Sequence, residues 1–223
     1  DDNEDDVRMD QEVRTQQVNI VIAIGGDNSL TYSVARGLWN ERIGQAGLIT
    51  LDAHHDVRDG TSNGSPVRRL VAAGLQGTHV VQIGISDFAN SPEYVARARD
   101  YGITVITRGA LRNRPIDDVV HEAIEIAGAS GGPIHVDVDL DVCDRAVVPA
   151  CPASLPGGIS ADELRQLVLG MCLSPQVASV DFAEVDALAD SPDGRTVRLV
   201  ALGVLDVMTS VALRKNLANT RIV

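Results

Sequence analysis

The feature that most constrains the fold of this sequence is the alternation of short apolar runs with segments of helical periodicity. Six runs are continuously rich in Val, Ile, Leu and Ala, which is typical of strands buried on both faces of a parallel sheet. They cover residues 18–24, 46–51, 78–85, 102–107, 133–140 and 177–185. Because parallel strands need crossover connections, the helical segments between them fit the same scheme. We therefore predict a three-layer αβα fold, in which a parallel β-sheet lies between two layers of helices.

Helical patterns fill the spaces between these runs. Helices are predicted over residues 29–41, 65–74, 91–102, 116–128, 160–171 and 195–216. Ser29, Ser91 and Ser160 stand where N-caps are expected, since a serine oxygen can accept a hydrogen bond from the first turn.

The length and composition of the chain are sufficient for one sizeable core. Of its 223 residues, 44% are hydrophobic, and neither a repeat nor a low-complexity linker divides it. We predict a single domain over residues 18–223. The acidic opening, which begins DDNEDD, is predicted to be a disordered segment over residues 1–17.

The net charge of −12 argues against a nucleic-acid or anionic-membrane partner and favours a cationic one. Neither a signal peptide nor an apolar run long enough to span a membrane is expected. Cys143, Cys151 and Cys172 form no CxxC or zinc spacing, so we interpret them as reduced thiols of a cytoplasmic protein.

Acidic residues gather where the predicted strands end. Asp52, His54 and Asp56 occupy alternate positions after one apolar run, and alternate residues of a strand share a face. Asp139 and Asp141 form a second such pair. Ligands of open parallel sheets bind beyond the carboxyl ends of the strands, so these side chains are expected to meet.

Four carboxylates and one imidazole, if they converge, call for a cation because like charges repel where water is partly excluded. An oxygen-rich ligand set favours a hard ion such as Mn²⁺ over zinc, and this number of carboxylates can hold two ions. A two-metal site lowers the pKa of a bound water. The alternative is that each cluster is a solvated strand-to-loop transition, since Asp is common in turns.

Three other motif interpretations fit poorly. The segment DVDLDVCD begins like a calcium-binding loop, but Val142 and Val148 replace the required Gly and Glu. A phosphatase of the haloacid-dehalogenase type would need an active-site lysine, and the only lysine is Lys215 in the last helix. The segment GGDNS lacks the GxGxxG pattern of dinucleotide binding.

The motifs GGDNS, DAHHD, DLDVCD…PACPASLPGG and EVD, in this order, resemble the ureohydrolase (arginase–agmatinase) family from about residue 18 to the end. The resemblance implies a parallel sheet flanked by helices with a binuclear manganese centre at the strand ends. The family's usual N-terminal strand and helix have no counterpart and the sequence lacks an initial Met, so we expect a truncated chain.

The resemblance also implies metal ligands. Asp52 and Asp139 match the bridging ligands of the two ions. His54 and Asp141 would complete one manganese site, and Asp56 would belong to the other.

Further positions that match the family concern the substrate and the second ion. Glu184 matches the carboxylate that binds the cationic carbon–nitrogen group. Asn28 stands where many members have a metal-ligating His, so its site is expected to bind Mn²⁺ more weakly through an amide oxygen. Asn63 replaces a histidine credited with proton shuttling, which leaves Asp56 to orient the attacking hydroxide and pass on its proton.

The combination of DAHHDVR…NGSPVRRL, FANSPEY and PACPASLPGG is similar to the formimidoylglutamase branch, which hydrolyses N-formimidoyl-L-glutamate to L-glutamate and formamide in histidine degradation. Arg58 lies where the family binds the amino-acid end of its substrate, and a guanidinium suits carboxylates. The alternative for Arg58 is a surface arginine, and Arg68 and Arg69 are expected to face solvent.

Two other functions stay open at this point. An agmatinase or guanidinobutyrase would release urea, whereas a non-catalytic relative would keep the fold for binding or assembly, with Asn28 and Asn63 as signs of decay. Family members often assemble, so a homo-oligomer is one expectation, although no interface can be identified from the sequence.

Overall fold

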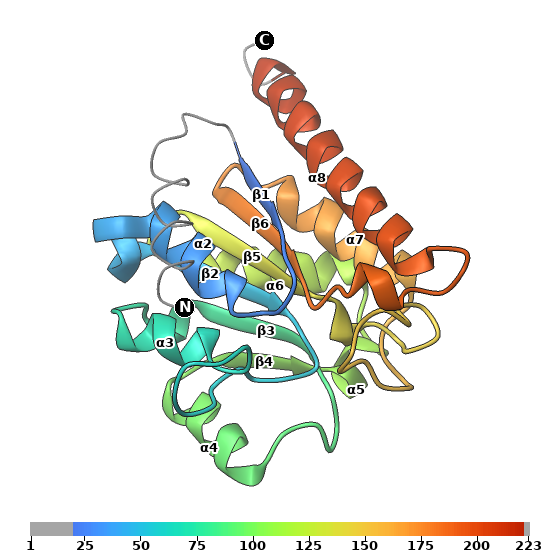
Figure 1. The fold of residues 1–223 in the computed structure, drawn as a ribbon. Coiled ribbons are helices and arrows are strands. Elements are labelled where there is room, and N and C mark those ends of the chain that lie inside the picture. The colour runs from blue at the N-terminus through green and yellow to red at the C-terminus, as the bar shows by residue number, and fades with distance from the viewer. Residues whose placement is uncertain (1–19, 221–223) are drawn as a thin grey trace.

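The computed structural model describes residues 20–220, and six strands form one parallel sheet in the order β1-β6-β5-β2-β3-β4 (Figure 1). The strands are β1 (Val21–Ile24), β2 (Gly47–Leu51), β3 (Val80–Ile85), β4 (Thr104–Thr107), β5 (Ile134–Asp139) and β6 (Val177–Ala183). Each predicted strand is confirmed, and each is shorter than the apolar run that predicted it. The predicted acidic segment 1–17 lies outside the described residues.

Helices cover both faces of the sheet and make the three predicted layers. They are α2 (Leu30–Trp39), α3 (Pro66–Ala72), α4 (Pro92–Asp100), α5 (Arg108–Leu111), α6 (Ile116–Ala127), α7 (Ala161–Cys172) and α8 (Arg195–Thr220). Side chains of α2, α3 and α4 form one apolar cluster with Leu48 and Val80. The larger cluster joins α6, α7 and α8 to the other face, where Ile49 and Leu51 point, so alternate strand residues supply the two cores. The short helix α5 was not predicted.

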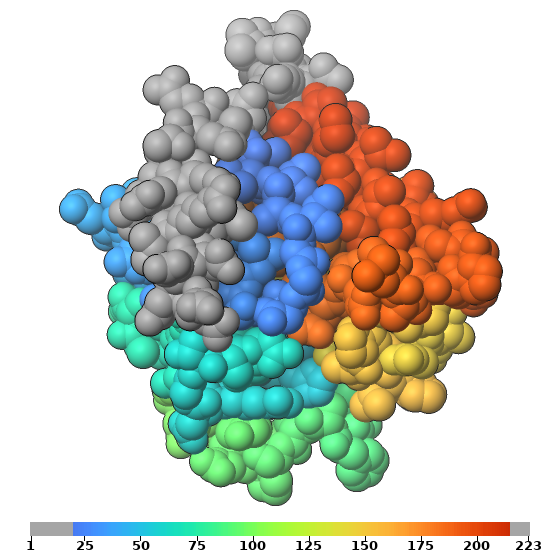
Figure 2. Space-filling view, in the orientation of Figure 1, coloured from blue at the N-terminus to red at the C-terminus, as the bar shows by residue number. Residues whose placement is uncertain are grey.

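The order of the strands creates a switch point between β2 and β5. From β2 the chain proceeds outward to β3 and β4, whereas β5 and β6 are added on the opposite side of β2. Figure 2 shows the early blue residues beside the orange and red segments, in agreement with the pairing of β1 with β6. Loops that leave neighbouring strands in opposite directions leave a crevice at such a point, where ligands of open α/β sheets bind.

Two of the three predicted N-caps are confirmed. The side chain of Ser91 accepts a hydrogen bond from the backbone N–H of Tyr94, and Ser160 forms a capping box with Glu163. The third, Ser29, does occupy the N-cap position of α2, but its side chain makes no capping hydrogen bond. Its hydroxyl donates to Asp27 at 2.5 Å, and its own backbone is already helical, so its oxygen does not face the first turn.

The last helix contradicts the expectation that no apolar run is long enough to span a membrane. In α8 the segment Arg195–Arg214 is long and apolar enough to cross a membrane by length and composition, with a mean hydropathy of 1.7. Core helices can meet the same criterion, and α8 places Leu199, Val200 and Val207 in the larger apolar cluster. A bidentate ion pair between Arg165 and Asp206 also ties α7 to α8.

Candidate metal and substrate site

The loop that follows β2 carries the first group of acidic residues, and it is anchored to the neighbouring strand. The N–H of Asp52 donates to Ile83 at 3.1 Å and that of Ser86 donates to Ala53 at 3.0 Å, which continues the strand pairing past the end of β2. The chain then turns sharply, because Asp56 has a positive φ of 52°. A non-glycine residue in the left-handed region is uncommon and concentrates at functional sites.

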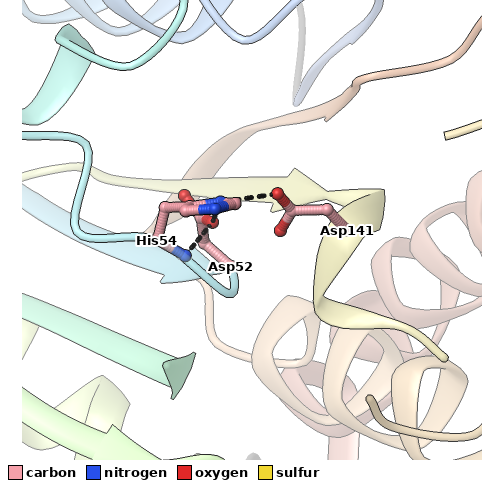
Figure 3. A group of neighbouring side chains, drawn as sticks. All are labelled: Asp52, His54 and Asp141. Atoms are coloured by element: carbon pink, nitrogen blue, oxygen red, sulfur yellow. Dashed lines mark hydrogen bonds and ion pairs between the residues drawn. The ribbon is translucent and has the colours of Figure 1, made fainter. Parts of the chain in front are cut away.

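Three of the predicted ligands meet at the switch point. One ligand atom from each of Asp52, His54 and Asp141 lies within 4.8 Å of the other two. Figure 3 shows the three side chains gathered together. The Nδ1 atom of His54 is 2.7 Å from Asp141 Oδ2 and 3.6 Å from Asp52 Oδ1. Residues that directly follow β2 and β5, about 90 positions apart in the chain, thus form one donor cluster.

The other predicted residues adjoin this cluster around a cavity of about 110 Å³. Its lining consists of His54, Asp56, Arg58, Asn63, Gly64, Asp139, Asp141, Ala153 and Glu184. Asp139 ends β5, and its Oδ1 accepts the backbone N–H of Asp141 at 2.8 Å. Glu184 follows β6 and, like Asp56, has a positive φ, of 60°. All the predicted substrate-binding residues therefore face the space beside the predicted ligands.

Asn28, which lies between β1 and α2, forms hydrogen bonds with two carboxylates of the site. Its backbone N–H donates to Glu184 Oε1 at 3.0 Å, and its side-chain Nδ2 donates to Asp56 Oδ2 at 2.6 Å. The amide oxygen accepts from the hydroxyl of Thr31 at 2.8 Å. Asn28 therefore presents a donor to the site, while the oxygen that would bind a cation is engaged elsewhere.

Burial and mutual repulsion disfavour the ionised forms of the clustered carboxyls. Burial raises the pKa of Asp52 well above its usual range, and the negative charges of Asp56 and Asp141 raise it further. The pKa of Asp139 is raised by the same two causes, and burial raises the pKa of Asp56 to about 7. The pKa of His54 is raised by its hydrogen bond to Asp141. A divalent cation would relieve this repulsion.

The donor set fits such a cation. Among the residues that the structure describes, no hydrogen-bond donor reaches the buried Oδ2 atom of Asp52, although buried polar atoms nearly always have a partner. Carboxylate oxygens with a single imidazole match Mn²⁺ or a similar hard ion.

Arg58, the predicted substrate-binding arginine, packs against Gly64, and Arg68 forms hydrogen bonds with the loop that carries Arg58. A Cβ atom at Gly64 would lie 2.6 Å from Arg58 Cδ, so the side chain of Arg58 occupies the space that only a glycine leaves open. Arg68 Nε donates to the carbonyl oxygen of Arg58 at 2.6 Å, and its guanidinium also bonds Gly60. The expectation that Arg68 and Arg69 face solvent was wrong, because Arg69 stacks 3.7 Å over the ring of Tyr32.

Some polar residues near the site were not singled out from the sequence. Gln82 and Asn90 form hydrogen bonds with the backbone of residues 52–56, which we call the metal-site loop. Asp137 and Asp181, which lie inside the predicted strands 133–140 and 177–185, are fully buried in the sheet. A polar side chain inside an otherwise apolar run was the available signal for Gln82 and Asp137.

Comparison with known proteins gives one family. The model of the arginase family matches residues 7–209. Formimidoylglutamases of Bacillus subtilis and Halalkalibacterium halodurans are 34% identical over 199 residues and 37% identical over 174 residues. These alignments cover 87% and 76% of this chain but 62% and 54% of the relatives, so the chain spans less than two thirds of their length.

The fold agrees with the same assignment. The crystal structure of the Bacillus subtilis formimidoylglutamase superposes with a TM-score of 0.87 at 31% identity and covers 94% of this chain and 68% of that one.

Proposed function

The chain belongs to the arginase family, and from this we propose that it is a manganese-dependent hydrolase of N-formimidoyl-L-glutamate, producing L-glutamate and formamide. The observation that carries the proposal is the convergence of Asp52, His54 and Asp141 beside a cavity that also holds a carboxylate and a guanidinium for the substrate. The similarity to two formimidoylglutamases supports the choice of substrate.

Asp52 and Asp139 would help to hold both of two ions, His54 and Asp141 would complete the ligands of one, and Asp56 would belong to the other. When bound, the ions would supply Lewis acidity and lower the pKa of the attacking water. Asn28 could offer its amide oxygen only if the amide turned over and the hydrogen bond to Thr31 were lost. We therefore propose that the ion beside Asn28 is the more weakly bound of the two.

Glu184 and Asn63 would hold the reacting end of the substrate. Glu184 Oε1 accepts from Asn63 Nδ2 at 3.2 Å, and a carboxylate in this place can pair with the planar, cationic formimidoyl group. Asp56 borders the same cavity and would orient the water that attacks the formimidoyl carbon and accept its proton.

Arg58 supports an acidic substrate over a basic one. Among the residues that line the cavity in the described part of the chain, it is the one arginine. Its guanidinium would pair with a carboxylate of the glutamate portion, whereas it would repel the cationic far end of agmatine.

The remaining proposals concern the setting of the enzyme. Cys143, Cys151 and Cys172 are buried free thiols, which fits a reducing cytoplasm. The partner would be a small-molecule substrate, with neither nucleic acid nor membrane involved.

The test is steady-state hydrolysis of formimidoylglutamate, agmatine, arginine and guanidinobutyrate, each with added Mn²⁺. We expect formamide from formimidoylglutamate to be the fastest product. Faster release of urea from agmatine or guanidinobutyrate would instead assign the chain to another branch of the family. If no substrate turns over and metal analysis finds no manganese, the chain is a non-catalytic relative.

A further inference from the structure

Asn90 forms hydrogen bonds with the metal-site loop. It lies in the motif FANSPEY, to which the proposed function assigns no role. It stands between β3 and α4, directly before the N-cap Ser91. Its Oδ1 accepts the backbone N–H of His55 at 3.0 Å, and its Nδ2 donates to the carbonyl oxygen of Ala53 at 3.0 Å. The two peptide groups bound by Asn90 thus lie on either side of His54.

An amide is chemically matched to this pair of groups. The N–H of His55 can only donate and the carbonyl of Ala53 can only accept, so one side chain must supply both an acceptor and a donor. Aspartate has the same shape but lacks the donor, and its second oxygen would face the oxygen of Ala53. Alanine would remove the acceptor of the His55 N–H and one of the two donors to the Ala53 carbonyl, which would keep the N–H of Ser86.

Two neighbouring backbone N–H groups of the loop donate to the predicted ligands themselves. The N–H of Ala53 donates to Asp141 Oδ1 at 2.9 Å, and the N–H of His54 donates to Asp52 Oδ1. Asn90 is therefore an anchor of this loop that does not use a ligand carboxylate. Gln82 adds a second neutral anchor, because its Nε2 donates to the carbonyl oxygen of His55 at 3.0 Å.

We propose that Asn90 is a positioning residue, which orients His54 for the metal by fixing the peptide groups on both sides of it. The proposal rests on the proposed manganese-dependent function. Groups that orient a ligand typically change metal affinity by 10- to 100-fold when they are removed. Because Asn90 acts on the backbone and leaves Gln82 in place, we expect a change near the lower end of that range.

The test compares Asn90→Ala and Asn90→Asp with the unaltered protein in a Mn²⁺ titration followed by electron paramagnetic resonance. We expect both variants to bind Mn²⁺ about tenfold more weakly. Asn90→Asp is the sharper variant, because an added negative charge by itself would tighten binding of a cation. Unchanged or tighter binding by Asn90→Asp would overturn the proposal, and it would do so even if Asn90→Ala did not fold.

Ser91→Ala is the matched control. It removes the cap of α4 next to Asn90 but no contact with the metal-site loop, so Mn²⁺ affinity should stay within twofold of the unaltered protein. An equal loss of affinity in Ser91→Ala would show that general loosening of the segment is the cause, and would contradict a specific role for Asn90.

Amide hydrogen exchange separates this inference from the proposed function. In metal-free protein, Asn90→Ala should accelerate exchange in the segment 53–56, whereas Ser91→Ala should not. If the unaltered protein binds no Mn²⁺, the proposed function fails, yet faster exchange in Asn90→Ala would still support the positioning of the loop. Unchanged exchange in Asn90→Ala would overturn it.

Discussion

The sheet holds two groups of buried acidic residues on the same face, and they differ in how their charge can be balanced. The upper group, Asp52, Asp139 and Asp141, adjoins the cavity at the strand ends. The lower group, Asp137 of β5 and its paired residue Asp181 of β6, is fully buried within the sheet, two residues before Asp139 along β5. Only the upper group has access to a space in which an exogenous cation can bind.

In the lower group, Asp181 has a partner within the protein. His135 Nε2 lies 3.1 Å from Asp181 Oδ2, and its Nδ1 lies 2.7 Å from the hydroxyl of Ser179. Burial and the adjacent Asp181 raise the pKa of Asp137 well above its usual range, which disfavours its ionised form. The comparison indicates that depth in the sheet decides whether a buried carboxyl has access to a cation from outside the protein.

Removal of an upper carboxylate should have the largest effect. Asp52→Asn should abolish tight Mn²⁺ binding and lower kcat/KM by at least about 10³-fold, because the metal ions stabilise transition-state charge by several kcal/mol. Without metal the same variant should be more stable than the unaltered protein, since it removes buried repulsion. Mn²⁺ titration, kinetics and thermal melts measure these effects, and normal Mn²⁺ binding by Asp52→Asn would remove Asp52 from the site.

The second prediction concerns pH in the absence of metal. The pKa of Asp56 rises from its unfolded value of 3.8 to about 7, so the folded state binds the proton more tightly than the unfolded state. The contribution of Asp56 to stability is thus present below about pH 4 and is lost as the pH rises toward 7. Thermal melts from pH 4 to 8 in a chelator should show this loss for the unaltered protein and a smaller one for Asp56→Asn.

Excess Mn²⁺ should reverse that dependence, because ligands must lose their protons to bind a metal. A pH profile that is identical with chelator and with Mn²⁺ would contradict the assignment of the upper group as ligands.

The third prediction tests the lower group. Asp181→Asn should reduce the free energy of unfolding by about 2 kcal/mol, because it disturbs a fully buried hydrogen bond to His135. Mn²⁺ affinity should change far less than in Asp52→Asn. Urea denaturation and metal titration measure the two quantities, and an equal loss of Mn²⁺ binding would erase the distinction between the groups.

The smallest effect is expected for Arg58, an exposed arginine that lines the cavity. Arg58→Ala should raise KM for formimidoylglutamate about tenfold with little change in kcat, since it removes one charge-assisted pair with the substrate. The exposed Arg112, which lies outside this cavity, supplies the control variant Arg112→Ala. If both variants have the same KM, Arg58 does not bind the substrate.

Much of the fold and part of the site could be predicted from the sequence, because both depend on local periodicity. The apolar runs identified the strands, and the parallel arrangement placed the strand ends at one edge. Asp139 and Asp141 were predicted to approach Asp52 and His54 for this reason, and the structure brings these segments together. Spacing did not distinguish Asp137 from Asp139, since both occupy the same face of β5.

Other features depended on contacts between distant segments. The amide of Asn28 faces Asp56 with its nitrogen because Thr31 takes its oxygen, and Ser29 bonds Asp27 instead of capping α2. Asn90 meets a loop 35 residues away. None of these partners follows from residue type and position alone.

The sequence by itself determined which side chains share a face and which strands end in acidic groups, because these follow from backbone geometry that every strand has. Only the tertiary structure decided how deep each carboxyl lies, which donor reaches it and whether a cavity opens beside it. Depth and access depend on the strands and loops packed around each residue, and thus on contacts that no local pattern encodes.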